Sequence, residues 1–206
     1  FEEMLPEPVD PYGMTKANIE RFLELYSEEF GFKYVILRPH NVYGPRQNLA
    51  DPYRNVLGIW MNRIMQDKAP VIYGDGEQTR AWTYIGDCTP YIAKAAWTKE
   101  AYGEIFNVGS EEVHTVNEAC KIVMDAMGYK GVWAHVAPRP MEVKHAWCSS
   151  HKAEKILGYK TKTSLMEGVA KMAEWAKREG PQPFQYLTHE FDIKKKVPKV
   201  WKEKQL

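Results

Sequence analysis

A helix that leads directly into a buried strand is the feature that most limits the folds open to this chain. Apolar side chains recur at helical spacing from Ile19 to Phe30 and stop at Gly31, which predicts an amphipathic helix following Lys16. Residues 34–38, Tyr-Val-Ile-Leu-Arg, then form a short apolar run of the buried-strand type that ends at Pro39. Because a helix feeding a buried strand is typical of parallel sheets, this order predicts an α/β fold.

The start of this helix carries the most reactive pair of side chains in the sequence. Tyr12 and Lys16 stand four residues apart, close to one helical turn, so their side chains project from the same face. At about 6 Å and an effective dielectric of about 20, the ammonium favours the ionised phenol by about 2.8 kcal/mol. A phenol that works as a base near neutral pH needs its pKa lowered further, and a second cation such as an oxidised nicotinamide ring would do this. The pair indicates a proton acceptor beside a cofactor, the alternative being two ordinary surface residues.

Composition favours a soluble globular enzyme. The 206 residues are 44% hydrophobic, carry a formal net charge of +1 and include no apolar run long enough to span a bilayer, so we expect no membrane and no nucleic-acid partner. The three cysteines are odd in number and scattered, as in a cytoplasmic protein with reduced thiols. His145, Cys148 and His151 lack the usual zinc spacing and a second ligand cluster, so no metal is predicted.

The chain also lacks the phosphate-binding turn of a dinucleotide-binding fold. No strand leads into G-x-G-x-x-G, since the run that Gly74 and Gly76 begin has Thr79 in its third place. The sequence opens at Phe1, with Tyr12 close behind. We therefore expect the C-terminal part of a longer protein whose dinucleotide-binding half, on the order of a hundred residues or more, precedes it.

Several motifs follow one another in a specific order. They are YGMTK at residues 12–16, LRPHNVYGP at 37–45, YGDGEQTR at 73–80, YIGD at 84–87, FNVG at 106–109 and PRPME at 138–142. In this order, from about residue 11 to residue 175, the chain resembles the C-terminal part of an NAD-dependent epimerase/dehydratase, within the extended short-chain dehydrogenase/reductase family. The resemblance is strongest to UDP-sugar 4-epimerases.

The resemblance implies the C-terminal portion of a Rossmann-type doubly wound α/β sheet plus a small mixed α/β substrate-binding lobe. On this basis residues 1–48 end the dinucleotide-binding domain, residues 49–179 interleave the substrate lobe with the last Rossmann elements, and residues 180–206 form an arm or tail. In the family the opening helix belongs to a two-fold four-helix interface, which implies a homodimer in which Phe22 and Tyr26 face the partner.

The implied chemistry is epimerisation of a nucleotide sugar with NAD as cofactor. Tyr12 takes the role of general base and Lys16 that of the residue that holds the nicotinamide ribose. A 4-keto sugar forms while the hydride is on NAD and receives it back on its other face, as in interconversion of UDP-glucose and UDP-galactose. The family's hydroxyl partner, a serine or threonine, has no candidate in residues 1–11. A nucleotide-sugar 4,6-dehydratase or decarboxylase shares these motifs, and an inactive fragment that keeps only binding or subunit association is the third reading.

The resemblance also places residues around the cofactor and the nucleoside. Residues 39–45 are expected to form the loop that leaves the carboxyl end of the strand, where open α/β sheets bind ligands. By resemblance the backbone at Pro39 and His40 approaches the nicotinamide, and Asn41 donates to the diphosphate, unless Asn41 only makes a turn. Residues 55 and 56 begin an apolar, helix-like stretch that runs to Met65.

Asn55 and Val56 contact the nucleotide in the family, whereas the plain alternative is an N-cap at Asn55 followed by core residues. Val71 and Tyr73 belong to a short β run that gives the base an apolar or aromatic wall, with plain core as the alternative for Tyr73.

Arg80 and Arg139 are the expected diphosphate ligands, because a guanidinium matches phosphate oxygens and stays charged at any working pH. Glu142 is expected to accept from the ribose hydroxyls. The resemblance departs after Arg80, where Ala81 and Trp82 replace the family's aspartate and remove a carboxylate partner from that region.

The rest of the chain reads as scaffold and a tail. Helices are expected at residues 89–97, 116–127, 151–157 and 165–177, and strands at 105–108 and 132–136. After Gly180 the prolines break the helical pattern, and Phe184, Tyr186 and Phe191 are candidates to pack as an arm. The lysines from Lys194 to Lys204 predict a solvated or disordered end, or docking onto an acidic neighbour.

Overall fold

The computed structural model describes residues 1–139, 142–186, 201 and 203–204. The elements follow one another as α1 (Pro11–Phe30), β1 (Ile36–Pro39), β2 (Val42–Tyr43), α2 (Val56–Met65), β3 (Val71–Tyr73), β4 (Thr79–Ala81), β5 (Thr83–Tyr84), α3 (Ile85–Ala95), η1 (Lys99–Ala101), β6 (Ile105–Val108), β7 (Val113–Thr115), α4 (Val116–Met127), β8 (Ala134–Val136), β9 (His145–Ala146), α5 (His151–Leu157) and α6 (Leu165–Glu179). No helix in these residues is long and apolar enough to cross a membrane.

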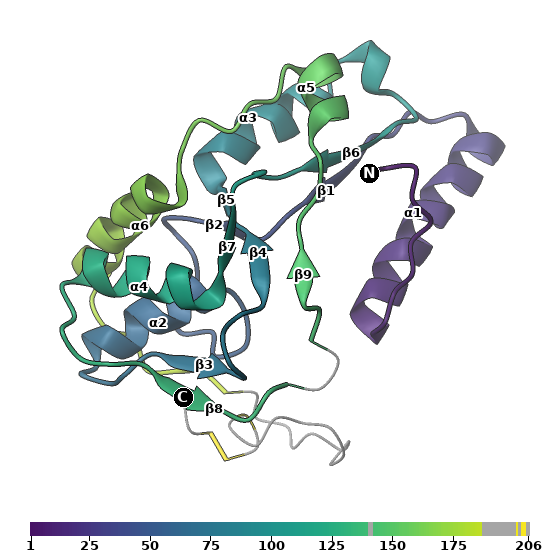
Figure 1. Cartoon of the computed structure of the whole chain (residues 1–206). Helices are drawn as coiled ribbons and strands as arrows, with labels where there is room; N and C mark the ends of the chain where they lie inside the picture. Colours follow the sequence, from purple (N-terminus) through teal and green to yellow (C-terminus); the bar gives the residue numbers. More distant parts are fainter. Residues whose placement is uncertain (140–141, 187–200, 202, 205–206) are drawn as a thin grey trace.

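The parallel sheet expected from the sequence is formed by β1 and β6. The two strands pair in register from Ile36 opposite Ile105 to Pro39 opposite Val108. Phe106 and Val108 of β6 are fully buried in a core shared with α3 and α5, which lie above the pair in Figure 1. The α/β prediction, with a helix feeding a parallel strand, is confirmed, although Ile36 is the one buried residue of β1.

Helix α1 has clear local signals at both ends. The Asp10 carboxylate accepts a hydrogen bond from the Gly13 amide at 2.6 Å, and Pro11 occupies the first turn, where its missing N–H costs nothing. Gly31 ends the helix in the left-handed conformation with a φ of 70°. The predicted stop at Gly31 is therefore confirmed.

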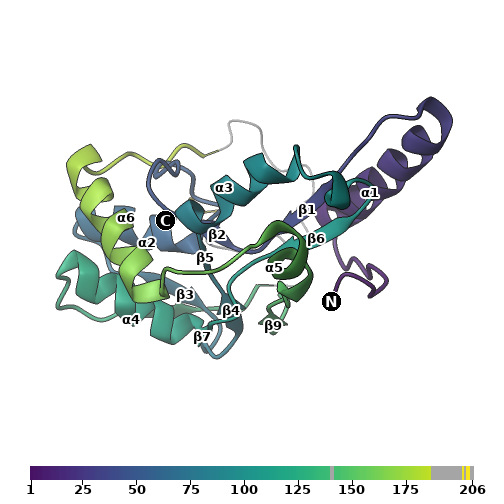
Figure 2. The same ribbon diagram turned by 90° about the horizontal axis from the view of Figure 1, so that it is seen from above.

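Helix α1 lies at the edge of the molecule and projects away from the other helices (Figures 1 and 2). Arg38 of β1 holds it through two hydrogen bonds to the Glu20 carboxylate, at 2.8 Å from Nε and 2.6 Å from Nη2. None of its residues is buried, and Phe22, Tyr26 and Phe30 are 58%, 53% and 69% exposed. The described residues thus leave the apolar stripe of α1 uncovered.

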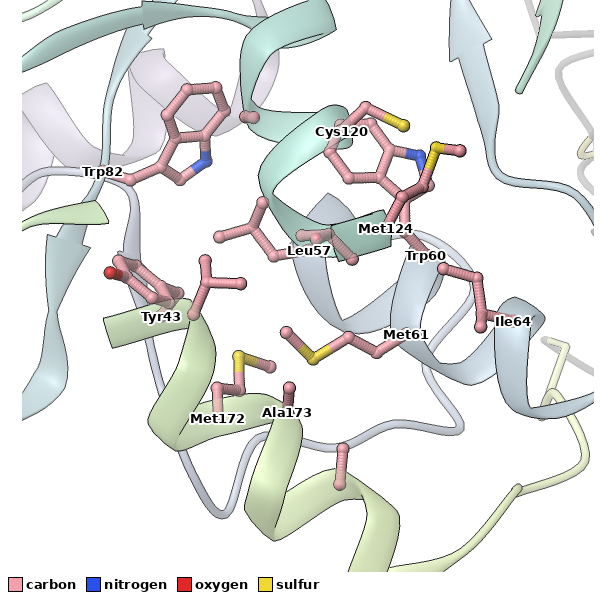
Figure 3. Close-up of a cluster of buried hydrophobic side chains, with 14 of the residues drawn as sticks. Tyr43, Leu57, Trp60, Met61, Ile64, Trp82, Cys120, Met124, Met172 and Ala173 are labelled. Carbon is pink, nitrogen blue, oxygen red and sulfur yellow. The ribbon is translucent and has the colours of Figure 1, made fainter. Parts of the chain in front are cut away.

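A second core lies between α2, α4 and α6. Figure 3 shows Leu57 and Met61 of α2 facing Met172 of α6, with Cys120 of α4 on the other side. Trp60 is fully buried, and its indole N–H donates to the Val71 carbonyl at 2.8 Å. This hydrogen bond ties β3, the strand after α2, to the second core.

Short strands frame this second core. β2 pairs parallel with β5, β3 pairs parallel with β8, and β4 lies between the antiparallel β7 and the parallel β9. The substrate lobe expected from the resemblance is thus a mixed α/β unit, as predicted.

Helices α2, α4 and α5 and strands β3 and β6 have the predicted bounds, while other elements differ. The strand expected at residues 34–38 begins at Ile36, opposite the first residue of β6. The helix expected at residues 89–97 begins at Ile85, because the Asp87 carboxylate in its first turn accepts from the amides of Lys162 and Thr163 at 2.9 and 2.8 Å. The loop expected at residues 39–45 contains the two-residue strand β2.

The chain after α6 begins as predicted. The helix ends at Glu179, before the two prolines, and the rings of Phe184 and Tyr186 lie 6.4 Å apart. Phe191 and the lysines from Lys194 to Lys202 fall outside the described residues.

Candidate functional site

One cleft gathers side chains from α2, β3, β4 and the segment after β8. All eight residues expected to bind a nucleotide sugar line it, although they come from separate parts of the chain. They are Asn41, Asn55, Val56, Val71, Tyr73, Arg80, Arg139 and Glu142. The cavity measures about 190 Å³.

Two guanidiniums and one carboxylate form the polar end of the cleft. Glu142 Oε1 lies 2.8 Å from Arg139 Nη2 and 3.5 Å from Arg80 Nη2. Arg80 Nη1 also donates to the carbonyls of Thr79 and Lys144, at 2.8 and 3.4 Å. Burial lowers the pKa of Arg80, Glu142 opposes that shift and Arg139 adds to it. Two positive charges against one negative charge leave a net attraction for an anion.

The departure after Arg80 has a structural explanation. Ala81 and Trp82 are buried, at 0% and 7% exposure, and Trp82 belongs to the second core. Glu142 supplies the carboxylate that faces Arg80, so the guanidinium is oriented without an aspartate at the next position.

Two asparagines in the cleft have positive φ, 41° for Asn41 and 62° for Asn55. Asn41 Nδ2 donates to the Ala81 carbonyl at 3.0 Å, which ties the loop after β1 to β4. Asn55 stands at the N-cap position of α2, but its side chain makes no capping hydrogen bond and is exposed. The side-chain cap considered for Asn55 is therefore not formed.

Val71 and Tyr73 of β3 form the apolar wall of the cleft. The Arg139 guanidinium carbon lies 4.9 Å from the centroid of the Tyr73 ring, within the range of a cation–π contact. Burial raises the pKa of the Tyr73 phenol. Tyr73 is half-buried and faces the cleft, so it is more than a core residue.

Tyr12 and Lys16 lie in a different hollow. Lys16 Nζ is 5.5 Å from the centroid of the Tyr12 ring, which confirms that the two side chains share a face of the helix. Together with Pro39 they line a space between α1, β1 and residues 1–8. The structure therefore does not bring this pair into the cleft of the two arginines.

His40 stands on the loop that connects the two spaces. Pro39 lines the hollow of Tyr12, and Asn41 lines the arginine cleft. Burial lowers the pKa of His40, and the charge of Arg80 lowers it further. The His40 Nδ1 atom is buried without a hydrogen-bond partner among the described residues. The side chain is thus held as a neutral imidazole.

The described residues offer no metal centre and no reactive thiol. No group of three or more His, Cys, Asp or Glu side chains in them is arranged to hold a metal ion. Cys88, Cys120 and Cys148 are buried and unpaired, and burial raises their pKa values to about 11, 12 and 11. The thiols are therefore protonated and structural.

Sequence reasoning missed two aromatic residues of the cleft. Tyr53 and Trp201 both line it, and their ring centroids lie 5.2 Å apart with an interplanar angle of 83°. Trp201 stands in the lysine-rich end, for which only a tail or a docking segment was expected. The tryptophan itself, a large apolar residue among lysines, was the sequence signal that could have indicated a packed position.

Comparison with known proteins identifies relatives among nucleotide-sugar enzymes. A sequence model of the family described as GDP-mannose 4,6 dehydratase matches residues 2–172. A putative UDP-glucose 4-epimerase of Methanocaldococcus jannaschii is 36% identical over 171 residues, which cover 82% of this chain and 54% of that protein. A dTDP-D-glucose 4,6-dehydratase of Mus musculus is 30% identical over 186 residues, covering 86% and 51%.

Solved structures of similar proteins have the same fold. UDP-glucose 4-epimerase of Thermotoga maritima with UDP-glucose gives a TM-score of 0.78 at 34% identity, covering 85% of this chain and 56% of that one. UDP-glucuronic acid 4-epimerase of Bacillus cereus with UDP-glucuronic acid and NAD gives 0.80 at 32%, covering 87% and 56%. The chain spans about half the length of the relatives that it matches.

Proposed function

The chain belongs to the NAD-dependent epimerase/dehydratase family of nucleotide-sugar enzymes, and from that premise we propose that it provides the substrate cleft and the catalytic pair of a 4-epimerase of the UDP-glucose/UDP-galactose type. One observation carries the proposal: the eight residues assigned to the nucleotide sugar by motif line a single cleft. Motifs that are far apart in the sequence would not converge in this way if each were a chance match.

The arrangement of charge in the cleft supports a diphosphate ligand. Arg80 and Arg139 would bind the two phosphates. Both guanidiniums face the one carboxylate of Glu142, so one positive charge is left over to attract an anion. Glu142 would then accept from the ribose hydroxyls. Val71 and Tyr73 offer the base an apolar wall, and Asn41, Asn55 and Val56 line the cleft beside it.

The residues present fit the nicotinamide ribose of NAD, because the hollow beside α1 offers an ammonium and a phenol on one face. NAD, when bound, accepts the hydride of the sugar carbon and returns it. Tyr12 would take the proton of the sugar 4-hydroxyl and give it back, while the positive charge of Lys16 favours the phenolate. The backbone at Pro39 and His40 would flank the nicotinamide, in keeping with the place of Pro39 in the same hollow.

A nucleotide-sugar 4,6-dehydratase is the second candidate, because the matching family model and the mouse relative both carry that description. A decarboxylase would use the same pair to form the same 4-keto sugar. Both reactions go on from that 4-keto sugar, with loss of water or of carbon dioxide, and need acid/base residues beyond Tyr12 and Lys16.

We also infer a homodimer formed through α1. The helix has no buried residue, and its stripe of Phe22, Tyr26 and Phe30 is more than half exposed. A second copy of the same helix would remove this apolar surface from water.

Product analysis tests the proposed function. Incubation of the protein with NAD and UDP-galactose is expected to give UDP-glucose, whereas a dehydratase would give a 4-keto-6-deoxy sugar. Tyr12→Phe is expected to abolish turnover while UDP still binds, and Tyr102→Phe, at a site that lines neither the cleft nor the hollow of Tyr12, is the matched control. Loss of all turnover in a protein that binds both UDP and NAD would favour the reading that only binding is retained.

A further inference from the structure

The cleft has an aromatic end that none of the matched motifs includes. Trp201 and Tyr53 line the cleft together, with their rings edge to face at 5.2 Å. Tyr53 also meets Tyr186 edge to face, with centroids 6.3 Å apart. Trp201 and Tyr186 both follow residue 172, where the family match ends.

The chain after α6 is anchored next to this aromatic end. The Gln182 amide donates to Asn62 Oδ1 at 2.9 Å, and the Gln182 carbonyl accepts from the side-chain amides of Asn62 and Gln66, each at 2.9 Å. The Gln185 amide donates to the Ala50 carbonyl at 2.8 Å. Because Ala50 leads into the loop that carries Tyr53, these bonds hold Tyr186 against the edge of the cleft.

The cleft combines aromatic and cationic groups. Trp201 and Tyr53 form an aromatic pair, and Tyr73 lies under the guanidinium of Arg139 at 4.9 Å. Arg139 is joined through Glu142 to Arg80. A nucleoside diphosphate offers a partner to each kind of group, a planar base to the aromatic rings and two phosphates to the guanidiniums.

We propose that Trp201 is a nucleobase-binding residue, which forms with Tyr53 a second wall for the base of the nucleotide sugar, in addition to that of Val71 and Tyr73. Trp201 is half-buried, so part of its indole remains open to the cleft. A base gains affinity on an aromatic ring because every base has a π face that can stack, with little dependence on hydrogen bonding. This inference rests on the proposed function only in taking a nucleotide as the ligand.

Calorimetric titration of the full chain with UDP and with inorganic pyrophosphate tests the inference. Trp201→Ala is expected to weaken UDP binding by roughly tenfold or more, since one base–aromatic stack accounts for about that change in Kd. Pyrophosphate affinity is expected to stay unchanged, because it depends on the arginine end. Trp201→Phe, which keeps an aromatic ring, is expected to recover most of the UDP affinity, and Trp97→Ala, at a site 85% exposed and outside the cleft, serves as the matched control.

Three results would overturn the inference: UDP affinity in Trp201→Ala equal to that of the unaltered chain, an equal loss of UDP and pyrophosphate affinity, or no UDP binding by the unaltered chain. Failure of the proposed function is a separate result. In that case UDP binding depends on Trp201 as described, while no conversion of UDP-galactose takes place in the presence of NAD.

Discussion

Replacing Arg80 by methionine tests the assignment of the cationic end of the cleft. Methionine keeps much of the length of the side chain but removes the charge and all five N–H donors. In the structure Arg80 Nη1 is engaged by the Thr79 and Lys144 carbonyls, while Nη2 lies 3.5 Å from the Glu142 carboxylate. The Nη2 side is therefore the part of the guanidinium available to a phosphate.

The expected loss follows from the strength of one charge-assisted hydrogen bond. Such a bond contributes about 1.5 to 3 kcal/mol, which corresponds to a UDP dissociation constant roughly 10-fold to 150-fold higher in Arg80→Met. The Arg80 side chain is only 15% exposed, so salt in the physiological range should reduce the difference only in part. Uridine, which has no phosphate, is expected to bind both proteins equally.

Calorimetry with UDP and uridine, at two salt concentrations, measures these changes. Arg46→Met is the matched control, because Arg46 is exposed and does not line the cleft. The reasoning is refuted if the two variants weaken UDP binding equally, since that would indicate a diffuse electrostatic effect. It is also refuted if Arg80→Met loses uridine and UDP in the same proportion, which would indicate collapse of the cleft.

Three further predictions concern stability, each measured as the free energy of unfolding in urea. Burial raises the pKa of Cys120 from 9.0 to about 12, so between these values the folded protein keeps a proton that the unfolded chain releases. The free energy of unfolding should therefore fall as the pH rises from about 9 to about 12, and this dependence on pH should be weaker in Cys120→Ala. Glu20→Gln breaks the paired hydrogen bonds between α1 and β1 and should cost about 1 to 2 kcal/mol, whereas Glu24→Gln, in an exposed pair on the same helix, should leave stability unchanged. Gly168→Ala places a Cβ atom that would meet the buried Tyr43 hydroxyl and should cost about 1 to 3 kcal/mol; a cost near zero would show that the Tyr43 ring moves freely.

Long elements with regular patterns were predictable because many residues repeat the same signal. The amphipathic stripe and Gly31 located the end of α1, and periodic apolar residues gave α2, α4 and α5 their bounds. Strands of two or three residues, such as β2, β5 and β9, are too short to show a period of two, and they form only where tertiary contacts align them. The start of α3 was missed because Gly86 and Pro90 conceal a helix that Asp87 anchors through the backbone of residues 162–163.

The part of the cleft assigned to the nucleotide sugar was predictable for a different reason. Its eight residues were identified from motifs that occur in one order, and no spacing along the chain would have grouped Arg80 with Arg139. Tyr53 and Trp201 belong to none of those motifs, and their contact joins segments far apart in the sequence. A contact of this kind depends on the path of the chain after α6, which local pattern does not encode.

The position of Tyr12 and Lys16 has a physical consequence for the proposed function. Pro39 lines the hollow of Tyr12, whereas Asn41, two residues later, lines the cleft of the arginines. A nucleotide sugar would therefore have to extend along this loop to reach both Tyr12 and the arginines. Helix α1, which carries Tyr12, is tied to β1 through the Glu20 carboxylate and has no buried residue. A helix that buries so little is weakly fixed in orientation, because burial of apolar surface is what mainly stabilises packing. The distance between Tyr12 and the two arginines should therefore become defined only when another surface covers the apolar stripe of α1. In the proposed enzyme, subunit association would then be a requirement for catalysis.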